Sequence, residues 1–181
     1  MLDPILRLAE RIDRARLRPR PVRSGGLIGI RLERHRGEEV ILQDGTVIRR
    51  GALVGAVHLD NRVVRRYASD DRLADGFAAG REELRLLAGW ARDRAPSDRP
   101  VAYSAKTILA AFARRVGFEE VPAPTAPDRI RGRLEDWYLR GVLARWAPQG
   151  RRRLRQGRGG LRAVALWLSA AELERRYGGE G

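Results

Sequence analysis

The chain has 181 residues, of which 43% are hydrophobic and 33% charged, a composition typical of one folded domain. It has no cysteine and two histidines, so disulfides, thiolate metal sites and histidine-rich metal centres are excluded. Its formal net charge of +14 comes from 37 basic and 23 acidic residues. This excess indicates an anionic partner (nucleic acid, lipid headgroup or acidic glycan) or a solvated basic surface without a dedicated ligand.

The first segment places apolar residues at helical spacing from Leu2 to Ile12, with arginines along a second stripe. It predicts a helix that ends before Pro19, either docked on the core or laid on an anionic membrane. No apolar run approaches the roughly 20 residues that span a bilayer, so we expect no transmembrane segment. The N-terminus lacks the sections of a signal peptide. We expect a cytoplasmic protein, peripheral at the inner membrane face if it meets a membrane.

Residues 28–59 carry the pattern of successive antiparallel strands. Apolar residues alternate with other types over 28–32, which is the period of a half-buried strand. Asp44 and Gly45 separate two short apolar runs and form the dipeptide that suits a tight hairpin. A further strand is predicted over 53–59. We therefore expect an antiparallel meander of three or four strands.

Helical periodicity follows from residue 71 to about residue 94, where Pro96 ends it. A short strand is predicted over 101–103. Ser104 then suits the N-cap of a helix that runs to Val116. Gly117 should end this helix in the left-handed conformation, with Phe118 folding back as its apolar contact.

The last third of the chain contains a predicted helix over 128–146, a basic segment, and an apolar run over 163–168 that indicates a buried strand. Ser169 and Glu172 have the spacing of a reciprocal cap, which predicts a final helix. We interpret the whole chain, 1–181, as a single domain.

The basic segment, an insertion at about 147–162, is predicted to be an exposed loop. Its arginines could form bidentate hydrogen bonds with phosphates or carboxylates, which makes the segment a candidate for polyanion binding. It lacks interleaved aromatic residues and any zinc-finger, basic-zipper or RNA-recognition signature, so sequence-specific reading of nucleic acid is unsupported while non-specific binding stays open. The candidate residues are Arg151, Arg152, Arg153, Arg155, Arg158 and Arg162.

Two polar groups are candidates for chemistry or ligand binding. His58 and Asp60, at the predicted end of a strand, are weak catalytic candidates, and the alternative is a structural histidine beside a capped turn. A strand-to-helix junction after residue 103 has amides that could hold an anion, although capping alone also explains its serine. The ligand-binding candidates of the two groups are Asn61, Ser104, Lys106 and Thr107.

The order of predicted elements up to the Gly117-Phe118 pair resembles the GNAT family of acyltransferases over roughly residues 1–121. The resemblance implies a three-layer α+β fold with a mainly antiparallel central sheet flanked by helices. That family holds the pyrophosphate of coenzyme A on backbone amides of a glycine-rich turn at a helix N-terminus. The matching interval here, 58–71, contains no glycine. We therefore expect no cofactor, with a divergent acetyl-CoA-dependent N-acyltransferase as the alternative.

A narrower resemblance lies in the segments 42–48 and 54–61 with Gly51 between them, which look like the YkoP-like domain of bacteria. The resemblance implies a setting among polysaccharide deacetylases and other cell-envelope genes. The chain has no deacetylase metal motif, so we expect no metal site. Our hypothesis is an accessory or recognition domain of envelope polysaccharide or lipid metabolism that binds an anionic ligand or surface, with an envelope enzyme as a candidate partner. The alternatives are the N-acyltransferase and a non-specific nucleic-acid-binding protein.

Overall fold

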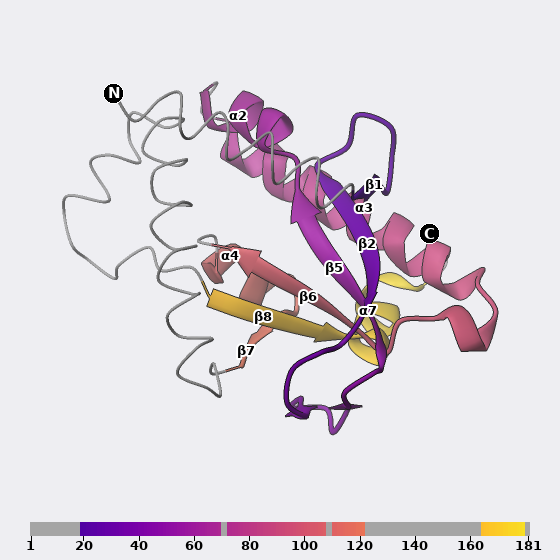
Figure 1. The fold of residues 1–181 in the computed structure, drawn as a ribbon. Coiled ribbons are helices and arrows are strands. Elements are labelled where there is room, and N and C mark those ends of the chain that lie inside the picture. Colours follow the sequence, from indigo (N-terminus) through magenta and orange to yellow (C-terminus); the bar gives the residue numbers. More distant parts are fainter. Residues whose placement is uncertain (1–18, 70–71, 108–109, 122–163, 180–181) are drawn as a thin grey trace.

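The computed structural model describes residues 19–69, 72–107, 110–121 and 164–179. Within these ranges the chain has the predicted α+β fold, in which a twisted sheet carries helices on one face (Figure 1). The strands are β1 (Arg20–Pro21), β2 (Ile28–Arg34), β3 (Val40–Ile41), β4 (Val47–Ile48), β5 (Leu53–Leu59), β6 (Ala102–Thr107), β7 (Glu119–Glu120) and β8 (Val164–Ser169). The helices are α2 (Asn61–Ser69), α3 (Leu73–Arg92), α4 (Ala110–Arg115) and α7 (Ala170–Tyr177), with a 3₁₀ turn η1 (Pro96–Asp98).

Six of these strands form one sheet in the order β1-β2-β5-β6-β8-β7. The pair β5–β6 is parallel and the other neighbours are antiparallel, which confirms a mainly antiparallel sheet. The predicted meander needs one correction. Strand β2 pairs directly with β5, and β3–β4 forms a separate two-stranded sheet because the chain between β2 and β5 folds out as a hairpin. Gly45 in that hairpin has a φ of 83°, as its turn requires.

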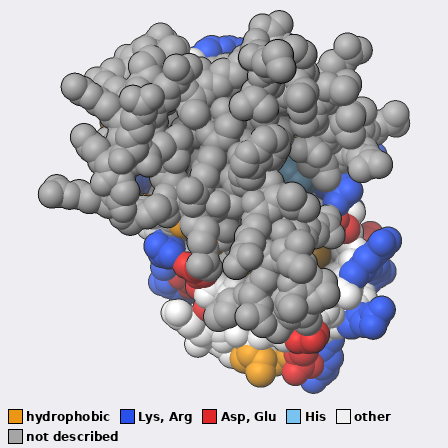
Figure 2. Space-filling model, turned by 60° about the vertical axis from the view of Figure 1, so that its left-hand side comes forward, with side chains coloured by type: hydrophobic (Ala, Val, Ile, Leu, Met, Phe, Trp, Pro, Cys, Tyr) orange, Lys and Arg blue, Asp and Glu red, His pale blue; other side chains and the backbone are white. Residues whose placement is uncertain are grey.

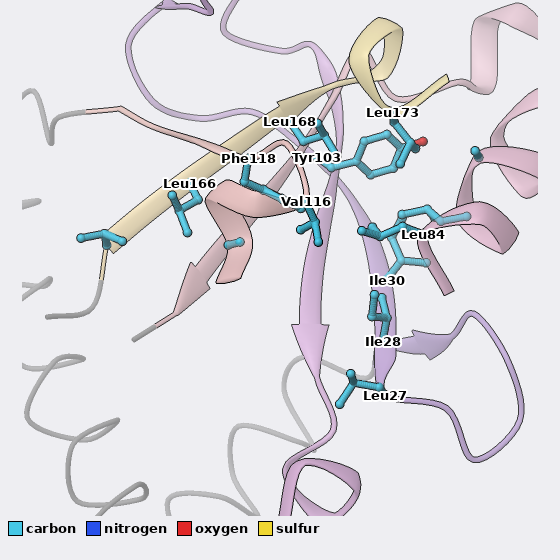
Figure 3. Close-up of a cluster of buried hydrophobic side chains, with 14 of the residues drawn as sticks. Leu27, Ile28, Ile30, Leu84, Tyr103, Val116, Phe118, Leu166, Leu168 and Leu173 are labelled. Atoms are coloured by element: carbon cyan, nitrogen blue, oxygen red, sulfur yellow. The ribbon is translucent and has the colours of Figure 1, made fainter. Parts of the chain in front are cut away.

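The main core lies between one face of the sheet and the helices (Figure 3). Alternation along each strand sends every second side chain to this face. Tyr103 of β6 is fully buried there, and Leu168 of β8 lies beside it in the register. Helix α3 contributes Leu84 and α7 contributes Leu173. The apolar period that predicted α3 is therefore the stripe that packs on the sheet.

A smaller cluster lies on the opposite face of the sheet. Leu42 and Ile48 from the hairpin pack on Val54 of β5 and Ala102 of β6. The hairpin thus covers the end of the sheet at which β5 and β6 begin. The predicted helices at the N-terminus and over 128–146 lie outside the described residues.

The helix predicted to start after Ser104 begins later, which is a correction. Residues up to Thr107 belong to β6, and α4 begins at Ala110. The reason is that β6 finds hydrogen-bonding strands on both sides, so sheet pairing overrides the local capping signal. Helix α2 was not predicted, since the helical periodicity was placed from residue 71 onward.

The end of α4 and the start of α7 follow the sequence signals. Gly117 has a φ of 102°, and the amide of Phe118 donates to the carbonyl of Ala113 at 2.9 Å. Ser169 caps α7 by accepting a hydrogen bond from the amide of Glu172 at 2.8 Å. Of the helices in the described ranges, none combines the length and apolarity that crossing a bilayer would take.

Candidate functional site

The candidate site lies where the two parallel strands of the sheet separate. Strands β5 and β6 are in register from Val54 opposite Ala102 to Val57 opposite Ala105. Both strands then continue for two more residues and diverge toward their carboxyl ends (Figure 1). In open, mostly parallel α/β sheets, ligand-binding residues commonly lie at the carboxyl ends of the strands, and β5 and β6 are the parallel pair of this sheet. We call this place the fork.

Three predicted side chains share one face of the sheet at the fork. Ser104 lies opposite Ala56, so His58 and Lys106, each two residues further along its strand, project to the same side. His58 is half-buried and Lys106 is exposed. Thr107 pairs with Val164 and projects to the opposite, core-facing side. The structure therefore brings together His58, Ser104 and Lys106 but not Thr107.

The same residues are not free in the structure. His58, Lys106 and Thr107 each have an interaction partner. Ser104 lies within β6 instead of at a helix start, so the open amides that were expected beside it take part in the sheet. Ser104 is therefore not the cap of a helix, whereas anion binding by Ser104, Lys106 and Thr107 stays a prediction.

Asp60 lies at the fork, between the end of β5 and the first residue of helix α2. Its carboxylate Oδ1 accepts a hydrogen bond from the amide of Arg62 at 2.7 Å, and its carbonyl accepts one from Val64 at 2.9 Å. Its own amide donates to the carbonyl of Leu27 at 2.8 Å. This is the hydrogen-bonding pattern of an N-cap, and it accounts for Asp60 structurally. Asn61 follows as the first residue of α2.

Two clefts in the described part of the chain lie away from the fork, and sequence reasoning found neither. One, of about 460 Å³, opens between β1, β2 and the end of α3. The other, of about 610 Å³, opens between the hairpin tip, the α4–β7 turn and the start of α7. The second joins segments too distant in sequence for any local signal.

The charged side chains that line the second cleft are paired with one another. The hydrogen bond from Arg175 and the ion pair with Arg176 outweigh partial burial and lower the pKa of Glu172 to about 2. Partial burial would raise the pKa of Asp44, but hydrogen bonds from Ser169 and Thr46 outweigh it, so the net shift is downward. Arg114 pairs with Glu120 at the same cleft. Its charges are therefore engaged within the protein.

The basic-loop arginines, from Arg151 to Arg162, lie outside the described residues, and their polyanion binding stays a prediction. On the described surface, Figure 2 shows basic side chains in several groups at both margins of the view, with acidic side chains beside them. Within the described ranges, no group of three or more histidine, aspartate or glutamate side chains is placed to hold a metal ion.

Comparison with known proteins places the chain in a family. A family model described as the YkoP domain matches residues 2–177. The match spans almost the whole chain, so the chain belongs to the YkoP domain family. No curated protein and no solved structure matches it.

Proposed function

We propose that this member of the YkoP domain family is an accessory or recognition domain of bacterial cell-envelope polysaccharide or lipid metabolism. It binds an acidic glycan at the cytoplasmic side of the envelope, beside an enzyme that acts on the same material, and performs no chemistry of its own. The net charge of +14 supports an anionic ligand.

The start of α2 is the observation that carries the proposal. The element order around it supports a degenerate acyltransferase-like architecture, since β5 leads into α2, β6 follows in parallel, and β8 lies between β6 and β7. In the GNAT family the amides at the corresponding helix start would hold the coenzyme A pyrophosphate. Here the carboxylate of Asp60 already accepts the amide of Arg62 at 2.7 Å.

Two further features oppose phosphate at this helix start. The negative charge of Asp60 would repel it, and no glycine between His58 and Asp71 allows the backbone to approach it closely. We therefore propose an acyltransferase-like fold that does not bind coenzyme A.

Isothermal titration calorimetry separates the candidate functions. The probes are acetyl-CoA, a uronic-acid oligosaccharide, a short DNA duplex and vesicles that contain phosphatidylglycerol. We expect heat with the oligosaccharide and none with acetyl-CoA. A micromolar dissociation constant for acetyl-CoA, worth about −8 kcal/mol, would overturn the proposal in favour of an N-acyltransferase.

The salt dependence tests the nucleic-acid alternative. Binding to duplex DNA releases condensed counterions, so its affinity falls steeply as salt rises. A discrete glycan site releases few counterions and should show a shallow slope. Tight duplex binding with a steep slope, together with no response to the oligosaccharide, would make the chain a non-specific nucleic-acid-binding protein instead.

A further inference from the structure

The cleft between β1, β2 and the end of α3 combines positive charge with an apolar wall. Its volume of about 460 Å³ is in the range of small-molecule sites and suits one or two sugar-sized rings. Two strands and the end of a helix, far apart in the sequence, line it. The lining residues include Arg20, Ile30, Arg31, Leu32, Trp90 and Arg94.

The guanidinium groups of this cleft outnumber the carboxylates that they contact. Arg31 forms an ion pair with Glu33 through Nη2. Its Nε is buried and donates no hydrogen bond within the described residues. Arg20 and Arg94 make no ion pair with any acidic residue in the described ranges. Arg31 lies opposite Ala56, so its side chain projects to the other face of the sheet from Ile30. Arg20 lies opposite Ile30 and projects with it. Arg20 and Arg94 therefore give the cleft a positive charge that favours an anion.

Arg94 is held in place before any ligand arrives. Its guanidinium carbon lies 4.6 Å from the centroid of the Trp90 ring, the geometry of a cation–π contact. Its Nε donates to the carbonyl of Asp98 at 3.1 Å. These two contacts reduce the side-chain entropy that binding would otherwise remove.

The wall beside these arginines is apolar. Trp90 is half-buried against the main core, Ile30 is buried, and Leu32 is half-buried. A simple inorganic anion would leave this wall in contact with water. A ligand with an apolar ring face would cover the wall while its charged group meets the arginines.

We propose that this cleft binds a ring-bearing carboxylate, the chemical class of an acidic sugar unit. The carboxylate contacts Arg20 and Arg94, and the ring lies along Trp90 and Leu32. The inference rests on the proposed function, because it assigns to the acidic glycan a site and a recognition mode. A duplex is a poor occupant, since its row of phosphates needs an extended basic surface instead of a cleft of this size.

Calorimetry with three matched ligands tests the recognition mode in the full chain. A uronic-acid disaccharide supplies ring and charge, a glucose disaccharide supplies the ring alone, and acetate supplies the charge alone. We expect the uronic-acid disaccharide to bind at least roughly tenfold more tightly than either of the others, because only it makes both kinds of contact. Equal affinity for acetate or for the glucose disaccharide would overturn the recognition mode.

A double variant, Arg20→Gln with Arg94→Gln, tests the site. We expect roughly tenfold or greater weakening of disaccharide binding from the loss of two charge-assisted contacts. The matched control is Arg49→Gln with Arg85→Gln, which removes the same charge from exposed arginines paired to Glu39 and Glu82. If loss of the contact between Arg94 and Trp90 unfolds the first variant, Arg20→Gln alone replaces it, with Arg49→Gln alone as its control.

The outcomes separate this inference from the proposed function. If only the cleft variant binds the disaccharide more weakly, the result supports both the cleft as the site and the proposed function. If the chain binds the disaccharide and the cleft variant binds it equally well, the cleft is the wrong site and the proposed function stands. Equal weakening in the control variant means that net charge alone drives binding, which also overturns the cleft. If the chain binds neither the disaccharide nor a longer uronic-acid polymer, the proposed function fails with it.

Discussion

Asp44, at the tip of the β3–β4 hairpin, accepts a hydrogen bond from the hydroxyl of Ser169, the residue that caps α7, 125 positions later in the chain. The oxygen of the same hydroxyl accepts the amide of Glu172 at 2.8 Å. One serine therefore caps a helix and anchors a hairpin. Because the hairpin also buries Leu42 and Ile48 on the sheet, this contact joins the smaller core to the C-terminal helix.

Replacing Ser169 by alanine should lower the free energy of unfolding by about 1–2 kcal/mol, since the cap is lost and Asp44 loses its partner. Urea denaturation measures the change. The matched control is Ser97→Ala in the exposed turn η1, which should stay within about 0.5 kcal/mol of the parent. Equal stabilities for the two variants would show that the contact contributes nothing.

The acid stability of the protein should depend on Glu172. Its pKa in the folded chain is about 2 against an ordinary value of 4.5. A carboxyl group whose pKa is lowered by folding stabilises the fold at pH values above its ordinary pKa. This contribution disappears as the pH falls from about 4.5 toward 2. Because the ion pairs are partly exposed, the loss should be about 1 kcal/mol or less.

Thermal unfolding over this pH range, compared with Glu172→Gln, isolates the contribution. The variant should lose less stability on acidification than the parent does. Arg175→Gln, which removes the main cause of the lowered pKa, should show an intermediate loss. Parallel pH profiles for the parent and both variants would contradict the assignment.

Glu83 of α3 should be the most sensitive acidic residue among those described. Its side chain is 1% exposed, and its carboxylate accepts the amides of Leu27 at 2.7 Å and Ile28 at 2.6 Å. Glu83→Ala leaves these donors without an acceptor and should cost roughly 3 kcal/mol. The neighbouring Glu82→Ala on the exposed side of α3 serves as control and should change the free energy of unfolding by less than about 0.5 kcal/mol. A cost for Glu83→Ala no larger than this would exclude an anchoring role.

Two glycine-to-alanine substitutions should have opposite signs. A Cβ on Gly55 would lie 2.7 Å from the ring of Tyr103 and 2.8 Å from Ile30, so this variant should lose about 1–3 kcal/mol through overpacking. Gly89 lies inside α3 with nothing within 4 Å of an added Cβ. Gly89→Ala should therefore gain about 0.5–1 kcal/mol through helix propensity. Chemical denaturation of both variants checks the pair, and a stabilised Gly55→Ala would contradict the packing.

The fork shows how far the sequence could define a site. The sequence pointed to His58 and Lys106 as separate candidates on separate segments. Their common face follows from the parallel pairing of β5 and β6, which no short-range pattern encodes. The cleft lined by Arg20 and Arg94 was missed for the same reason, since β1 and the end of α3 meet only in the folded chain.

The sequence by itself determined the features whose physical causes lie within a few residues. The hairpin turn at Gly45, the helix end at Gly117 and the cap at Ser169 all depend on local backbone geometry or on a hydrogen bond across three positions. Tertiary structure alone decided that β2 pairs with β5 past the hairpin and that Ser104 belongs to a strand. A residue takes the conformation in which its backbone groups find partners and its apolar side finds the core, and for these segments both came from distant parts of the chain.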